Sequence, residues 1–368
     1  MTRTQRRTRA IALTLGLSLA LAACGGTTQD SVDDDAPDTG TDQTQDPDDG
    51  AEETDDGADG DGEYAEGLAI TMLPKSVNNP YFETSSEGAE AVVTELGGSY
   101  EYTGPSDASA SSQVSYINTL SQQGVDAILL SANDPNALCS SLDQASAEGA
   151  AIITFDSDVD PDCRDLFVSQ VDGDEVGKAL IEMAAEQADG EGQIAVLSAT
   201  ANAANQNAWI AVMEEELASN PDYADLELVA TAYGDDEDEK SFAETQGLLQ
   251  SHPDLKVIVA PTTVGILAAA RYVQGSDYDV AVTGLGTPND MREYVDDGTV
   301  TEFALWDPGA LGELAAYTGA AFASGMISGE GDTFTAGELG DYTVEADGVV
   351  ILGPPTRFNA ENIEDFNF

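Results

Sequence analysis

The apolar positions of this chain fall into short unbroken runs that are separated by helix-like segments of mixed polarity. From Leu68 onward the runs predict strands at 68–73, 100–102, 126–130, 151–155 and 166–170. Between and after them the pattern predicts helices at 81–96, 111–123, 136–148 and 175–187. Short strands that are apolar throughout are typical of parallel sheets with helices on both faces.

The same alternation then starts again. The second series predicts strands at 193–198, 227–232, 256–260, 279–283 and 302–305, helices at 206–218, 240–250, 264–273, 288–295 and 309–326, and a last strand at 348–352. We therefore predict an α/β protein with two doubly wound parallel-sheet lobes joined by a hinge near residues 170–172. Lobe I is expected at 67–171 plus 307–335, and lobe II at 172–306 plus 336–368.

The first 24 residues carry a different pattern. Four arginines precede an apolar run at 11–23, which is too short to span a bilayer and ends in small residues. The final letters, LAAC at 21–24, resemble the lipobox of bacterial lipoproteins. We expect 1–23 to be a lipoprotein signal peptide and Cys24 to carry a lipid that holds the protein outside the cytoplasm on the cell membrane. An ordinary secretory signal is the alternative, and it also implies export.

The charge of the chain narrows the choice of partners. There are 12 Lys and Arg against 70 Asp and Glu. Such an acidic surface repels phosphate backbones and anionic headgroups, which excludes nucleic-acid binding and adhesion through a basic patch. Residues 25–62 are acidic or small and polar, with no Lys or Arg. We expect 24–66 to be the lipidated Cys followed by a disordered acidic linker, and the membrane to be contacted only through the lipid.

Two further cysteines, Cys139 and Cys163, lie within the predicted lobes. An even pair of cysteines in an exported domain predicts a disulfide. The alternative is two buried free thiols.

Polar and aromatic side chains follow the predicted strands at their carboxyl ends. Ligands of open parallel sheets bind at these ends. Carboxylates and amides can bond the hydroxyls of a polyhydroxylated ligand, and aromatic faces can cover its C–H surface. One Asp, Asn or Pro after a strand is more often a turn former or a helix cap, so the inference depends on the whole set.

These loops give the chain a family resemblance. The segments are PKSVNNPYF, QGVDAILLSANDPNAL, TFDSDVDPDCR, NQNAW, APTTVG, GLGTPNDMREYVDDGTV and FALWDP. Over 68–368 the chain resembles the type I periplasmic sugar-binding proteins of ABC transporters, the ribose-binding superfamily, and especially its rhamnose-binding and autoinducer-2-binding branch. The resemblance implies a monomer without cofactor or metal that binds a monosaccharide between two lobes and delivers it to an ABC permease and its ATPase.

The resemblance also implies ligand-binding residues. Autoinducer-2 receptors build their pocket from a Lys, an Asp, an Asp-Gln pair, and a Pro with an Ala two residues later. The matching positions here are Lys75, Asp156, Asn205, Gln206, Pro261 and Thr263. Asn205 replaces the Asp and Thr263 replaces the Ala. The ligand is therefore expected to be L-rhamnose or a related deoxy sugar, with autoinducer-2 as the alternative. Tyr81, Phe82 and Trp306 match aromatic pocket positions of the broader superfamily.

An enzyme is the rival class. A glycosidase needs two carboxylates, for which Asp134, Asp156 and Asp158 are candidates. His252 is the only histidine, so no Ser-His-Asp or Cys-His set exists. We expect no catalysis.

A calcium site is the second rival. Asp occupies alternate positions from 156 to 162, which is the spacing of a calcium loop. Pro161, however, stands where an EF-hand requires Gly, and the closing Glu is missing. We therefore expect no metal.

Overall fold

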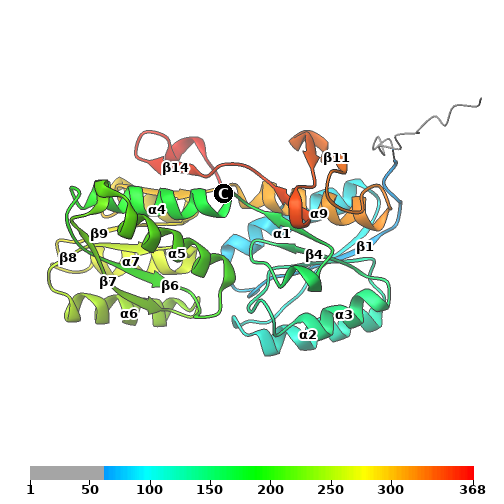
Figure 1. Ribbon diagram of the computed structural model, residues 1–368, viewed down its shortest axis with the longest axis horizontal. Coiled ribbons are helices and arrows are strands. Elements are labelled where there is room, and N and C mark those ends of the chain that lie inside the picture. The colour runs from blue at the N-terminus through cyan, green and yellow to red at the C-terminus, as the bar shows by residue number, and fades with distance from the viewer. Residues whose placement is uncertain (1–61) are drawn as a thin grey trace, which may run out of the picture. The chain divides into compact units, whose positions relative to one another are not determined.

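The structure is a computed structural model that describes residues 62–368 (Figure 1). The predicted signal peptide, Cys24 and nearly all of the predicted acidic linker lie outside the described residues. Within 62–368, no helix combines the length and the apolar composition needed to cross a bilayer.

Six parallel strands form the first sheet. In sheet order they are β13 (Val349–Ile351), β5 (Leu166–Ser169), β4 (Ala151–Phe155), β3 (Ala127–Leu130), β1 (Ala69–Leu73) and β2 (Ser99–Tyr102). The helices on it are α1 (Pro80–Glu95), α2 (Ala110–Gln123), α3 (Cys139–Ala147) and α9 (Pro308–Ala323). Helices α2 and α3 cover one face, and α1 and α9 cover the other (Figure 1). We call this sheet and its helices lobe I.

Four parallel strands form the second sheet. In sheet order they are β7 (Leu226–Tyr233), β6 (Gly192–Ser198), β8 (Leu255–Ala260) and β9 (Ala281–Gly284). Its helices are α4 (Gly173–Gln187), α5 (Ala204–Ser219), α6 (Asp238–Ser251), α7 (Thr263–Gln274) and α8 (Pro288–Asp296). Beside it, β10 (Glu302–Leu305) pairs antiparallel with β14 (Thr356–Asn359). We call these elements lobe II.

The remaining elements are short. They are the hairpin β11 (Thr333–Thr335) and β12 (Asp341–Thr343), and the 3-10 turns η1 (Pro161–Cys163), η2 (Pro221–Tyr223), η3 (Gly337–Leu339), η4 (Ala346–Gly348) and η5 (Ile363–Asp365). Most strands of the two predicted series thus form two separate sheets, except that β10 pairs with β14 and β13 joins the first sheet, and the predicted α/β class is confirmed.

Local chemistry explains where the elements begin and how they pack. Helix α1 begins at Pro80 because the side chain of Asn79 accepts the N–H of Tyr81, which caps the helix at 3.0 Å. Every residue of β3 and β4 is buried or nearly so, as expected for central strands covered on both faces. Helices α1 and α9 pack with their backbones in contact at Gly312, where a residue with a side chain would not fit. A Cβ at this position would lie 1.8 Å from the carbonyl oxygen of Ser85.

The chain passes between the two sheets three times. The first passage, at 170–172, and the second, at 306–307, coincide with the predicted lobe boundaries. The third lies at 352–355 and not at the expected boundary between 335 and 336. The reason is β13, which pairs with β5 and extends the sheet of lobe I, whereas β14 alone returns to lobe II.

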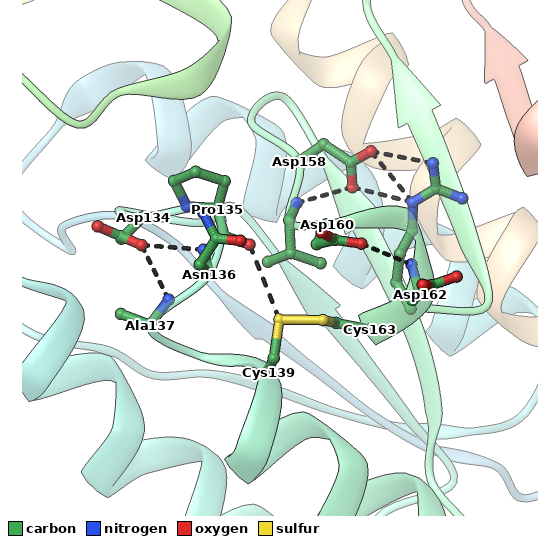
Figure 2. Close-up of a disulfide and its surroundings, with 11 residues drawn as sticks. Asp134, Pro135, Asn136, Ala137, Cys139, Asp158, Asp160, Asp162 and Cys163 are labelled. Carbon is green, nitrogen blue, oxygen red and sulfur yellow. Dashed lines mark hydrogen bonds and ion pairs between the residues drawn. A yellow bond between two sulfur atoms is a disulfide. The ribbon is translucent and has the colours of Figure 1, made fainter.

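A disulfide links Cys139, the first residue of α3, to Cys163 at the end of η1 (Figure 2). The predicted pair is therefore present, and the alternative of two free thiols does not hold. Beside it, Arg164 donates to both carboxylate oxygens of Asp158 at 3.0–3.1 Å and to the carbonyl of Asp347 at 2.8 Å. Through these bonds, Arg164 connects Asp158, in the loop after β4, to the segment that leads into β13.

Candidate functional site

One small cavity, about 40 Å³ in volume, lies at the carboxyl ends of strands from both sheets. All nine residues predicted to contact a ligand line it: Lys75, Tyr81, Phe82, Asp156, Asn205, Gln206, Pro261, Thr263 and Trp306. The structure therefore brings the whole predicted set together, although their segments are spread over more than 200 residues of the chain.

A buried ion pair forms the floor of the cavity in lobe I. Lys75 follows β1, and its Nζ lies 3.2 Å from Oδ2 of Asp156, which follows β4. The two side chains are 6% and 7% exposed, so water does little to screen the pair. Ser131 donates its hydroxyl to the same carboxylate oxygen at 2.7 Å. Asp156 has a positive φ of 60°, an uncommon conformation that cavity-lining residues can retain for function.

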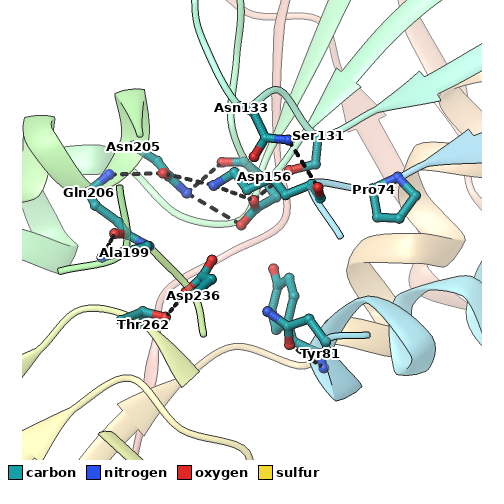
Figure 3. A network of polar contacts seen from close by, with 12 residues as sticks. Pro74, Tyr81, Ser131, Asn133, Asp156, Ala199, Asn205, Gln206, Asp236 and Thr262 are labelled. Atoms are coloured by element: carbon teal, nitrogen blue, oxygen red, sulfur yellow. Dashed lines mark hydrogen bonds and ion pairs between the residues drawn. The ribbon is translucent and has the colours of Figure 1, made fainter. Parts of the chain in front are cut away.

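Asn205 connects this pair to lobe II (Figure 3). Its Oδ1 accepts from Lys75 Nζ at 3.2 Å, and its Nδ2 lies 3.4 Å from Oδ1 of Asp156. A second contact across the lobes joins Thr263 Oγ1 to Asn79 Oδ1 at 3.4 Å. Gln206 is held differently, because its Oε1 accepts from the Ser198 hydroxyl at 2.8 Å within lobe II. Its amide oxygen is therefore used inside the protein, and only its NH₂ group remains for a ligand.

Aromatic rings form another part of the lining. Tyr81 and Phe82 stand edge to face, with ring centroids 5.0 Å apart, and Trp306 donates its indole N–H to the Tyr81 hydroxyl at 2.8 Å. Burial, followed by the charge of Asp156, raises the pKa of Tyr81 well above its ordinary value, so the phenol stays neutral. Trp209 extends the wall beside Trp306. The lining of the cavity thus combines charged and amide groups with apolar ring faces.

Several residues that line the cavity were not among those predicted from the sequence to bind a ligand. They are Asn79, Trp209, Asp236, Thr262, Leu285 and Leu305. Asn79 and Trp209 lie inside segments that carry the family resemblance. Asp236 follows the end of β7 by three residues, so the rule that ligands bind after strands would have found it.

Asp134 and Asp158, the other two candidates for glycosidase carboxylates, form hydrogen bonds outside the cavity. Asp134 accepts the N–H groups of Asn136 and Ala137, which is the role of a turn former. Asp158 is bonded to Arg164, and neither Asp134 nor Asp158 lines the cavity. In residues 62–368, no group of three or more His, Cys, Asp or Glu could hold a metal ion.

Comparison with known proteins identifies the family. Residues 70–326 match the model of the periplasmic binding protein domain. A crystal structure of a sugar ABC transporter protein from Actinomyces odontolyticus is 52% identical, with a TM-score of 0.66, and the match covers 82% of this chain and 98% of that one.

Two further solved structures carry ligands. An ABC transporter solute-binding protein from Clostridium phytofermentas with bound L-rhamnose is 36% identical, with a TM-score of 0.79, over 82% of this chain and 98% of that one. LsrB from Clostridium saccharobutylicum in complex with autoinducer-2 is 29% identical, with a TM-score of 0.78, over 82% and 100%. These matches confirm the family resemblance and the expectation of a binding protein in place of an enzyme. The chain belongs to the periplasmic binding protein family.

Proposed function

We propose that this protein is the extracytoplasmic receptor of an ABC importer, and that it binds one neutral monosaccharide between its two lobes. The observation that carries the proposal is the single cavity in which Lys75, Asp156 and Asn205 face Tyr81 and Trp306. A sugar ring has hydroxyls around its edge and C–H groups on its faces, and the cavity presents the complementary groups.

Binding is coupled to closure of the lobes in this account. The contacts of Asn205 with Lys75 and Asp156 join groups that belong to different lobes. A sugar bound there contacts both lobes when they are closed and one lobe when they are open, so it favours the closed state. The three passages at 170–172, 306–307 and 352–355 are the segments that would bend.

L-rhamnose or a related deoxy sugar is the proposed ligand. Asn205 and Thr263 replace the Asp and Ala of the autoinducer-2 pocket, so the site loses one carboxylate and gains one hydroxyl. A furanose with many hydroxyls would lack one carboxylate acceptor in this site. A deoxyhexose needs fewer acceptors, because it presents fewer hydroxyls and an apolar methyl group. The similarity to the rhamnose-bound protein supports this choice.

Autoinducer-2 is the second candidate. Lys75, Asp156, Gln206 and Pro261 match four of the six residue types in that pocket, and LsrB is among the similar structures. The lobes and the hinge would act in the same way for either ligand, so the two candidate functions differ only in which sugar the cavity binds.

The setting of the receptor follows from the first residues of the sequence. The arginines, the apolar run and Cys24 support a lipid anchor on the cell membrane, with the acidic segment as a spacer. The receptor would then act as a monomer that meets its permease and ATPase at the membrane surface.

Tryptophan fluorescence tests the proposal directly. The chain has two tryptophans, and both Trp209 and Trp306 line the cavity, so a ligand bound there must change their emission. The mature protein would be titrated with L-rhamnose, autoinducer-2, D-ribose and other neutral deoxyhexoses. We expect L-rhamnose to give a saturable change at the lowest concentration. Saturation by autoinducer-2 alone would establish the second candidate, and a flat response to every sugar would refute the proposed function.

A further inference from the structure

Asp236 places a second carboxylate in the cavity, on the lobe opposite to Asp156. It lines the cavity together with Lys75 and Asp156, and Figure 3 shows its carboxylate facing the space beside Tyr81. The hydroxyl of Thr262 donates to its Oδ1 at 2.5 Å. In residues 62–368, no hydrogen bond reaches its other oxygen, which leaves an acceptor on the cavity side.

The backbone holds Asp236 in this position at a cost. Asp235 and Asp236 both adopt left-handed conformations, with φ of 55° and 52°. Left-handed backbone is unfavourable for most residues other than Gly, although Asp and Asn adopt it more readily, and it persists where the surrounding structure fixes it. Asp156 shows the same feature with φ of 60°, so both carboxylates of the cavity stand on left-handed backbone.

The charges of the cavity are unbalanced. Lys75 is the single basic side chain among the lining residues, and it already pairs with Asp156 at 3.2 Å. Asp236 therefore adds a negative charge that no cation in the lining neutralises by direct contact. A ligand bearing its own negative charge would meet two carboxylates in a space from which water is largely excluded.

We propose that Asp236 is a second hydroxyl-binding carboxylate and that, with Asp156, it restricts the site to uncharged sugars. This inference rests on the proposed function, because it assigns a role within the same cavity. One carboxylate from each lobe then accepts hydroxyls from the bound sugar, which makes binding depend on both lobes. Sugar acids and phosphorylated sugars are excluded by charge repulsion.

The substitution Asp236→Asn tests the role with little disturbance of the backbone. Asn tolerates left-handed φ as well as Asp does, and its side-chain oxygen can still accept from Thr262. Asp235→Asn is the matched control: Asp235 is adjacent, has the same backbone conformation and ion-pairs with Lys240, but it does not line the cavity. Both variants and the wild type would be titrated with L-rhamnose and with D-glucuronate, a sugar acid.

We expect Asp236→Asn to weaken L-rhamnose binding by about 10- to 100-fold, the range for a hydrogen bond to a charged group. Asp235→Asn should bind as the wild type does. The wild type should bind D-glucuronate at least about 100-fold more weakly than L-rhamnose, because like charges repel strongly at low dielectric. In Asp236→Asn, the ratio of the dissociation constant for D-glucuronate to that for L-rhamnose should be smaller than in the wild type.

A stability measurement separates a binding role from a structural one. Burial raises the pKa of the Asp236 carboxyl above its usual value, a shift that the Thr262 hydroxyl and Lys75 oppose and that Asp156 and Asp235 reinforce. A carboxyl with a raised pKa in the folded state stabilises the fold when protonated, and that stability is lost as pH rises through the folded pKa. At neutral pH, Asp236→Asn should therefore unfold at a temperature no lower than that of the wild type.

The outcomes are distinguishable. If the wild type binds L-rhamnose and Asp236→Asn binds it equally well, or if both variants weaken binding alike, the role of Asp236 is refuted while the proposed function stands. Tight binding of D-glucuronate by the wild type would overturn the exclusion of charged sugars. If the wild type binds no neutral sugar, the proposed function fails and this inference falls with it. Should autoinducer-2 or D-ribose be the sugar that binds, it replaces L-rhamnose in the same comparison.

Discussion

Asp156 is the residue on which the chemistry of the cavity most depends, since it contacts groups from both lobes. It pairs with Lys75, accepts from Ser131 and lies beside the amide of Asn205. All nine binding residues expected from the sequence line the cavity, because each lies just after a strand or in the first turn of the helix that follows it, positions that the strand pattern locates. Asp236 was missed although it follows β7 by only three residues: its neighbours are also acidic, so it did not stand out among them.

Removing the Asp156 charge should harm both binding and stability. In Asp156→Asn, Lys75 would remain buried without its counter-charge, and leaving one partner of a buried ion pair costs about 3–5 kcal/mol. We expect a lower unfolding free energy in urea and a loss of L-rhamnose affinity of at least about 10-fold, as the sugar also loses a charged acceptor. Unchanged affinity in a folded variant would show that Asp156 is not a ligand-binding residue.

At the scale of elements, the sequence pattern predicted the order of strands and helices well, because apolar runs of five residues read clearly as buried parallel strands. The placement of 336–368 was wrong for β13. Val349–Ile351 is a short apolar strand, and its partner β5 lies about 180 residues earlier in the chain. Periodicity can identify such a strand, but it does not reveal which sheet the strand joins.

The disulfide is an element-scale feature that should affect stability and leave binding unchanged. It joins α3 to η1 over a sequence separation of 24, and neither cysteine lines the cavity. A cross-link over a loop of this length stabilises by about 3 kcal/mol in the chain-entropy model. We expect the Cys139→Ser/Cys163→Ser variant to lose about that much unfolding free energy, measured by urea denaturation, with L-rhamnose affinity unchanged. Impaired sugar binding in the folded variant would indicate that the bond also shapes the site.

The whole molecule is a pair of lobes whose binding groups are divided between them. Lys75, Asp156 and Tyr81 belong to lobe I, whereas Asn205 and Thr263 belong to lobe II, so neither lobe alone holds the full set. This division makes the ligand the link that favours closure. The sequence indicated the two lobes from the repeated strand pattern, and the chain passes between the two sheets at 170–172, 306–307 and 352–355.

Calorimetric titration of the mature protein with L-rhamnose is the most direct test of this account. A single cavity built from both lobes predicts one saturable event, with one sugar bound per chain and a dissociation constant of micromolar or tighter, and with the sugar recovered unaltered afterwards. Absence of heat with L-rhamnose and with every other neutral monosaccharide, or recovery of a converted sugar, would contradict it.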